Sequence, residues 1–144
     1  MPNTTIAILT VESIHYIWDE LRNKTLSITK LYLKAGTYRR TVTNEYLRLE
    51  DGQPAMTVGD GLIRDATIMG ITANCETNHN WAVKIFRKGV ITPLVTLNLV
   101  GQNYKKDSSL NVDVPGGSVL LFKVEGINIP FPRVLLELAW EVTA

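Results

Sequence analysis

The side chains best suited to chemistry lie in one polar run, residues 74–80. Cys75, Glu76 and His79 place a thiol, a carboxylate and an imidazole in this short stretch. A catalytic cysteine needs a histidine within hydrogen-bond reach, and a third group that orients the histidine. A structural zinc site needs four ligands, so this cluster falls short unless symmetry brings several copies together. The pattern favours a free thiol and a surface histidine on a loop.

Other arrangements that catalysis requires are missing or weak. A glycosidase needs two placed carboxylates, whereas Asp60 and Asp65 lie in or beside a turn. The chain contains no G-x-S-x-G motif, no P-loop and no dinucleotide-binding G-x-G-x-x-G. We therefore predict no catalytic residue, no cofactor and no metal ligand, and we do not expect the protein to be an enzyme.

Two aromatic residues are candidates for holding a ligand by stacking. Trp81 begins an alternating run directly after residues 74–80, and Tyr104 lies in a second polar run, residues 101–109. Both polar runs are predicted to be loops, where binding residues are commonly found. Trp81 and Tyr104 are thus the predicted ligand-contacting residues.

The length, net charge and cysteine count of the chain argue against several classes of partner. Its 144 residues correspond to one domain with a sizeable core. The formal net charge of +1 gives no reason to expect nucleic acid. No apolar run approaches the ~20 residues of a membrane span, and the N-terminus lacks a signal-peptide pattern. Cys75 is the only cysteine, so no intrachain disulfide can form. We expect synthesis in the cytoplasm, with no nucleic-acid or membrane partner.

The first 24 residues form a predicted arm and helix. Thr10 can cap a helix, Glu12 lies in the first turn, and apolar residues recur after it at helical spacing. A strand is less favoured here, because the apolar period is not two. The helix is predicted to lie on the sandwich or on a neighbouring subunit. The predicted interface residues of this segment are Ile6, Ile8, Leu9, Ile14, Ile17 and Trp18.

Residues 25–144 are predicted to be all-β. Short runs that alternate apolar and polar residues are broken by turns rich in Gly and Asn, and this pattern predicts roughly eight to ten antiparallel strands in a sandwich or barrel. Val134, Leu136 and Leu138 are expected to point to one face of the last strand. Residues 119–124 are apolar on both sides, so both faces of that strand are expected to be covered.

Residues 44–144 resemble the small jelly-roll domains of tailed-phage virion proteins. The runs that carry the resemblance are residues 44–54, 62–73, 81–89, 110–120 and 136–142. The resemblance is one of pattern, without a catalytic motif. It implies a two-sheet antiparallel jelly-roll β-sandwich like that of tumour necrosis factor and C1q, a fold that commonly forms homotrimers. Residues 1–43 have no counterpart in it.

The resemblance implies two functions. A compact domain with a short N-terminal arm is similar to a capsid decoration, or cement, protein, which would bind the major capsid protein on the virion surface as a homotrimer. The alternative is a head- or tail-fibre module that binds a receptor or a carbohydrate through Trp81 and Tyr104. A fibre protein usually carries a long helical or repetitive stalk, and this chain has none. The decoration protein is therefore the first expectation.

Overall fold

A computed structural model describes residues 29–37, 40–49 and 60–140. The chain divides into two compact units, Lys30–Ala139 and a second made of Met1–Thr29 with Trp140–Ala144. Nearly all the described residues belong to the first unit. The predicted arm and helix of residues 1–24 lie outside the described residues, together with all six predicted interface residues. That segment and its boundary with the β-domain therefore remain predictions.

The described residues contain strands and no helix, which confirms the prediction of an all-β fold. The strands are β1 (Thr29–Gly36), β2 (Thr41–Val42), β3 (Glu45–Tyr46), β4 (Arg48–Leu49), β5 (Asp60–Gly61), β6 (Ala66–Arg87), β7 (Val95–Asp107), β8 (Val112–Val114), β9 (Val119–Glu125), β10 (Ile129–Pro130) and β11 (Arg133–Trp140).

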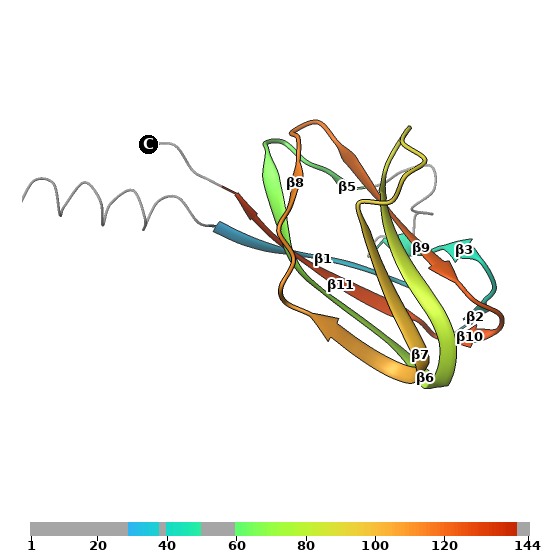
Figure 1. The fold of residues 1–144 in the computed structure, drawn as a ribbon. Coiled ribbons are helices and arrows are strands. Elements are labelled where there is room, and N and C mark those ends of the chain that lie inside the picture. Colours follow the sequence, from blue (N-terminus) through green and yellow to red (C-terminus); the bar gives the residue numbers. More distant parts are fainter. Residues whose placement is uncertain (1–28, 38–39, 50–59, 141–144) are drawn as a thin grey trace, which may run out of the picture. The chain divides into compact units, whose positions relative to one another are not determined.

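One antiparallel sheet, centred on β6, contains most of these strands. The order along its main path is β3-β9-β6-β11-β1-β4; β5 pairs with β9, and both β7 and β8 pair with β6. The first part of β6 pairs with β11 and β8, and the last part pairs with β9. β7 follows β6 on both sides of a bend. Figure 1 shows β6 and β7 turning together at the bottom of the view, so that the sheet curls over itself. β2 and β10 form a separate pair.

The bend corrects two predictions, because residues 74–80 and most of residues 101–109 are strand and not loop. The register of β6 with β7 shifts between Asn74 and His79, and again between His79 and Trp81. Extra residues on one strand of a pair disrupt the ladder and bend it. Gly101 has φ 61°, a conformation that glycine adopts without steric cost. The polar residues at the bend are mostly exposed, which is why their composition imitates that of a loop.

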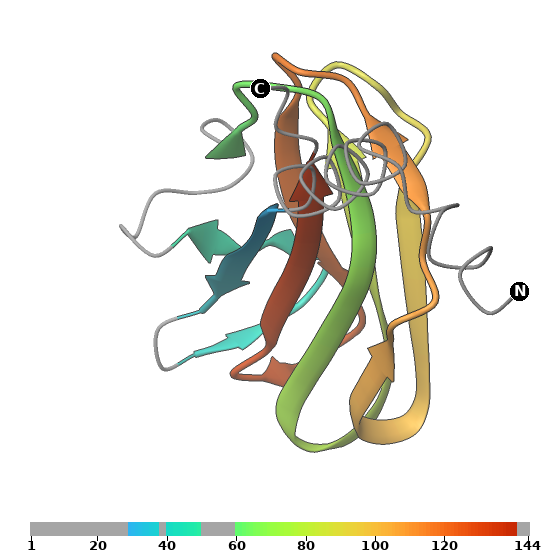
Figure 2. The same ribbon diagram turned by 90° about the vertical axis from the view of Figure 1, so that its left-hand side faces the viewer.

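The core lies between the two layers that the curled sheet creates. Val134, Leu136 and Leu138 of β11 are buried, as their alternation predicts. Figure 2 shows β11 beside the first part of β6, with which it pairs. Each fully buried aliphatic or Phe side chain contributes about 1.5–3 kcal/mol relative to an exposed one. The largest fully buried side chains are Phe122, Leu47, Ile68, Ile71, Ile85, Leu99, Leu120, Ile129, Leu136 and Leu138.

β9 is buried on one face and only partly covered on the other, so the prediction that both faces are covered holds for part of the strand. Leu120 and Phe122 are fully buried, and Leu121, which points to the opposite face, is 7% exposed. Leu121 is paired with Phe86 of β6. The outer face of this layer therefore holds apolar side chains as well as polar ones.

Candidate functional site

The Cys75 cluster does not form a catalytic pair. Cys75 is buried, and its Sγ donates to the carbonyl oxygen of Thr77 at 3.0 Å. The ring Nε2 of His79 instead lies 2.9 Å from the side-chain oxygen Oγ1 of Thr77. Burial raises the pKa of the Cys75 thiol, although its hydrogen bond to Thr77 acts in the opposite direction. A reactive cysteine needs the opposite shift, because the thiolate is the nucleophile.

Of the two carboxylates considered for chemistry, that of Asp65 has an architectural role. Asp65 accepts a hydrogen bond from the main-chain N–H of Gly116 at 2.7 Å, and so joins two turns. Asp60 lies in the short strand β5, paired with Leu120. Within the described ranges, His, Cys, Asp and Glu side chains nowhere gather in a group that could hold a metal ion. No helix among these residues is long and apolar enough to span a bilayer.

Trp81 lies in the core and not on a ligand-binding surface. It is 5% exposed, and its indole Nε1 donates to the carbonyl oxygen of Gln102 at 3.0 Å. A stacking platform needs an exposed ring face, so this burial argues against the predicted ligand role of Trp81. The sequence pattern could have revealed this, because Trp81 is in phase with the buried residues Val83 and Ile85.

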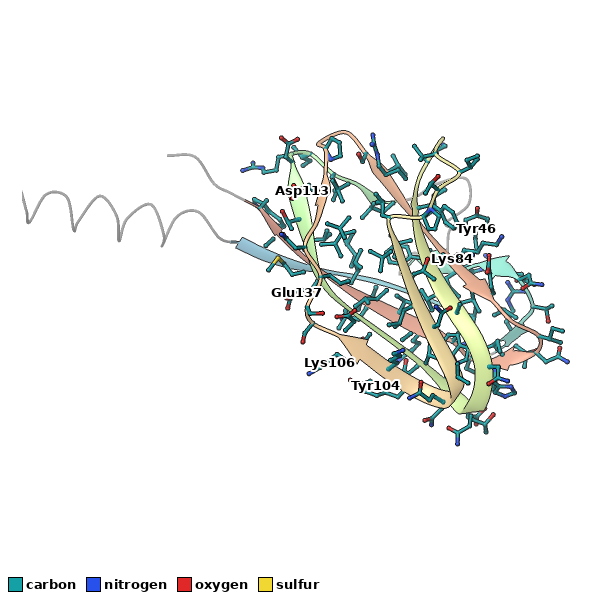
Figure 3. All side chains as sticks on the ribbon, viewed as in Figure 1. Tyr46, Lys84, Tyr104, Lys106, Asp113 and Glu137 are labelled. Carbon is teal, nitrogen blue, oxygen red and sulfur yellow. The ribbon has the colours of Figure 1, made fainter. Side chains whose placement is uncertain are left out.

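Tyr104 is exposed, as a ligand-contacting residue must be. It is 54% exposed on β7, where it is paired with Asn74. Figure 3 shows Tyr104 and Lys106 on the outside of β7, away from the core. Of the two predicted ligand residues, Trp81 is therefore buried and Tyr104 faces solvent.

The outer face of the β9 layer carries an ordered cluster that the sequence reading missed. The rings of Tyr46 and Phe86 have centroids 6.5 Å apart, and Nζ of Lys123 lies 5.7 Å from the centroid of the Tyr46 ring. The carboxylate of Glu125 forms ion pairs with Nζ of Lys84 at 2.9 Å and with Nζ of Lys123 at 3.8 Å. These residues come from three strands that are far apart in sequence, so no local motif marks them. Figure 3 labels Tyr46 and Lys84 on this side of the molecule.

One end of the curled sheet gathers three turns, which we call the turn end: residues 62–65, 88–94 and 115–118. The main-chain N–H of Leu62 donates to the carbonyl oxygen of Ser118, and that of Gly117 donates to Leu62. The N–H of Lys88 donates to the carbonyl of Val119, directly after the third turn. Figures 1 and 2 both show the three turns at the top of the view, with residues 88–94 to the right of the other two.

The turn end exposes large apolar side chains beside positive charge. Ile63 is 93% exposed and Ile91 is 95% exposed, and Val90 beside it is 43% exposed. Arg64 and Lys88 are exposed basic residues on the same turns. Ile63 and Ile91 lie on different turns, which are hydrogen-bonded to the neighbouring residues Ser118 and Val119. Exposed apolar side chains with a polar rim are typical of a surface that contacts another molecule. The turn end is therefore the best candidate site in the described part of the chain.

Comparison with known proteins gives only distant structural likenesses. No protein-family model matches the chain, and no curated protein matches its sequence. A subunit of Bacillus endospore appendages, which are disulfide-linked pili, is 8% identical with a TM-score of 0.49; the match covers 81% of this chain and 90% of that one.

Two further solved structures have similarly low sequence identities and TM-scores. A chain of the capsid of a Helicobacter pylori bacteriophage is 12% identical with a TM-score of 0.49, covering 81% of this chain and 94% of that one. A carbohydrate-binding module of a xylanase from the hindgut metagenome of Trinervitermes trinervoides is 13% identical with a TM-score of 0.45, covering 81% and 98%. At such low identities and scores, these likenesses carry no inference about function.

Proposed function

We propose that the protein is a structural component of a tailed-phage virion, a jelly-roll decoration protein that stabilises the head. In this proposal it binds the major capsid protein on the capsid surface as a homotrimer, and it catalyses no reaction. The pattern of residues 44–144 supports the virion assignment. The Cys75 thiol is bonded to Thr77 and not to His79, so this cluster offers no catalytic pair against the proposal.

The observation that carries the proposal is the exposure of Ile63 and Ile91 at the turn end, at 93% and 95%. Each isoleucine that becomes fully buried against a partner contributes about 1.5–3 kcal/mol. A homotrimer presents this surface three times, so that weak contacts add up to firm attachment. In the same proposal the arm of residues 1–24 crosses to neighbouring subunits and adds the apolar contacts of Ile8, Ile14 and Trp18.

Two measurements test this function. The mass of the native oligomer should be that of a trimer. Purified protein added to capsids built from the major capsid protein of the same genome should sediment with them.

The double variant Ile63→Ser, Ile91→Ser tests the turn end. It should remain folded, since both side chains are already in water, and should bind capsids at least tenfold more weakly. Ile127→Ser, which changes a 71% exposed isoleucine outside the turn end, is the matched control. A monomer, or wild-type protein that ignores capsids, would contradict the proposal.

Deleting residues 1–20 separates the arm from the turn end. The truncated protein is expected to stay trimeric and to lose most of its capsid binding. Normal decoration by the truncated protein would rule out the arm as an attachment element and leave the turn end as the contact.

The alternative is a fibre module that binds a receptor or a carbohydrate, and the exposed ring of Tyr104 favours it. In that case a glycan array should show binding that Tyr104→Ala abolishes without changing stability. If the array shows no glycan binding and the protein binds capsids, the decoration protein is favoured over the fibre module.

A further inference from the structure

Two side chains point into the core at the turn end, where the layer formed by β6 and β9 finishes. Along β6, Trp81, Val83 and Ile85 are buried at alternate positions, and Arg87 is the next residue in that phase. Along β9, Leu120 is fully buried, and Ser118 precedes it by two residues and is 6% exposed. Arg87 is paired with Leu120. Ser118 is therefore the diagonal neighbour of Arg87, a separation that long side chains can cross.

Both of these side chains carry a polar atom that is buried without a hydrogen-bond partner. The atoms are Nε of Arg87 and Oγ of Ser118, and they are the two such side-chain atoms found in the described residues. Arg87 also forms none of the ion pairs found there. Buried polar groups in native proteins are nearly always satisfied, so two exceptions at one place call for an explanation. Arg87 ends β6 and Ser118 directly precedes the neighbouring strand β9, so the two atoms lie at one end of one layer.

A single chemical group could form hydrogen bonds with both the Arg87 guanidinium and the Ser118 hydroxyl. A guanidinium has only donors, and it binds a carboxylate through two parallel hydrogen bonds. A serine hydroxyl rotates and can donate to the same carboxylate. Arg87 is half-buried, so rotation about its side-chain bonds can present the Nε edge to a group that arrives from solvent.

The charge of the turn end favours an acidic partner. Arg64 and Lys88 lie on the three turns, and Arg87 directly precedes the second of them. Asp65, which is bound to the N–H of Gly116, is the one acidic residue of the turns, and Asp60 lies just before the first. A carboxylate that enters from a partner therefore meets net positive charge.

We propose that the turn end is a docking site for a carboxylate side chain of a partner protein, flanked in that partner by apolar residues. The carboxylate binds Arg87 and Ser118, and the flanking residues pack on Ile63 and Ile91. The identity of the partner as the major capsid protein rests on the proposed function, but the carboxylate site does not.

Titration with acetate tests the site on the isolated full-length protein. Acetate replaces chloride at constant ionic strength while the Nε–H signals of the arginines are followed by NMR. The Arg87 signal should shift and saturate, and Ser118→Ala should weaken acetate binding several-fold. Arg133, an exposed arginine on β11, is the internal reference. If the Arg87 signal shifts only linearly, as that of Arg133 does, no carboxylate site exists and the proposal is wrong.

Capsid binding tests the partner. Arg87→Met keeps the length of the side chain and removes the donors, and Arg133→Met makes the same change outside the turn end. Arg87→Met should bind capsids at least tenfold more weakly, with an unchanged or higher midpoint of thermal unfolding, because an unsatisfied buried donor has been removed. Arg133→Met should bind like wild type.

The outcomes separate this inference from the proposed function. A lower unfolding midpoint for Arg87→Met would show that Arg87 supports the fold, and would overturn the docking role. Undiminished capsid binding by Arg87→Met would overturn the assignment of the partner. If wild-type protein does not bind capsids, the proposed function fails, while saturation by acetate would still support the carboxylate site.

Discussion

The indole Nε1 of Trp81 donates a hydrogen bond to the carbonyl oxygen of Gln102, 3.0 Å away, where β6 and β7 bend together. Two further side chains bind main-chain groups at the same bend. Oδ1 of Asn80 accepts from the N–H of Gly101 at 2.7 Å, and Nζ of Lys105 donates to the carbonyl of Asn98 at 2.7 Å. Register shifts remove ladder hydrogen bonds here, and these side chains replace part of what is lost. Trp81 therefore stabilises the bend.

Replacing Trp81 with Phe tests this role. The variant keeps an aromatic ring in the core but leaves the carbonyl of Gln102 without its donor. We expect a loss of about 0.5–1.5 kcal/mol in the free energy of unfolding from the lost hydrogen bond, and about 3–5 kcal/mol for Trp81→Ala, which also leaves a cavity. Urea denaturation measures both values. Tyr104→Phe, on an exposed side chain, is the control and should change stability by less than about 0.5 kcal/mol. Wild-type stability in Trp81→Phe would contradict the role at the bend.

Gly116 is predicted to tolerate no side chain. A Cβ at this position would lie 2.9 Å from the Cα and carbonyl carbon of Arg64, which are main-chain atoms and cannot move aside cheaply. Gly116→Ala should cost about 1–3 kcal/mol through overpacking. At Gly61 the nearest atom to an added Cβ is a side-chain carbon of Val119 at 4.0 Å, so Gly61→Ala should be nearly neutral. Thermal unfolding of the two variants compares them, and equal effects would contradict the steric argument.

The Cys75 thiol should react slowly and make stability depend on alkaline pH. Burial raises its pKa above the ordinary 9.0, so the folded state disfavours the thiolate. Stability is therefore fully present below pH 9 and decreases as the pH rises through the shifted pKa. Urea unfolding between pH 7 and pH 10 should show this fall, and Cys75→Ala should reduce it. A native thiol that reacts with a disulfide reagent as fast as the unfolded chain would contradict the burial of Cys75.

Asp107 should titrate below its usual range. Its Oδ1 accepts from Ser109 Oγ at 2.7 Å and from Ser109 N–H at 2.9 Å, and these hydrogen bonds lower the pKa of the carboxyl from 3.8. The stabilisation is present above pH 3.8 and is lost as the pH falls through the lowered pKa. NMR titration of the Asp107 carboxyl measures the pKa directly. Ser109→Ala should raise it, because one donor is removed, whereas Ser108→Ala should leave it unchanged.

The alternation of apolar and polar residues in the sequence correctly predicted strands that have one buried face and one exposed face. Val134, Leu136 and Leu138 followed that rule. The rule failed at residues 74–80, because a strand that bends away from the core exposes polar residues on both sides. Periodicity describes one strand at a time, so it cannot reveal that β6 continues through the bend.

The candidate site was harder to predict, because its residues come from separate turns. Ile63 and Ile91 are isolated apolar residues in polar surroundings, and each alone would need no explanation. Only the pairing of Lys88 with Val119 and of Leu62 with Ser118 brings their turns to one end. The relation of Arg87 to Ser118 likewise depends on the register of β6 with β9, which the sequence does not specify.

The passage of β6 through both layers has a consequence for how the protein folds. Its partners are distant along the chain, as the pairs Ala66 with Val114 and Thr67 with Ala139 show. Loops of this length must close before their contacts can stabilise anything, so folding should be slow for a domain of this size. Once formed, β6 cannot be released without opening both layers. The amide hydrogens of its two paired parts, on either side of the bend at residues 74–80, should therefore exchange with solvent only through global unfolding. Those of the bend, where the ladder is interrupted, should exchange sooner.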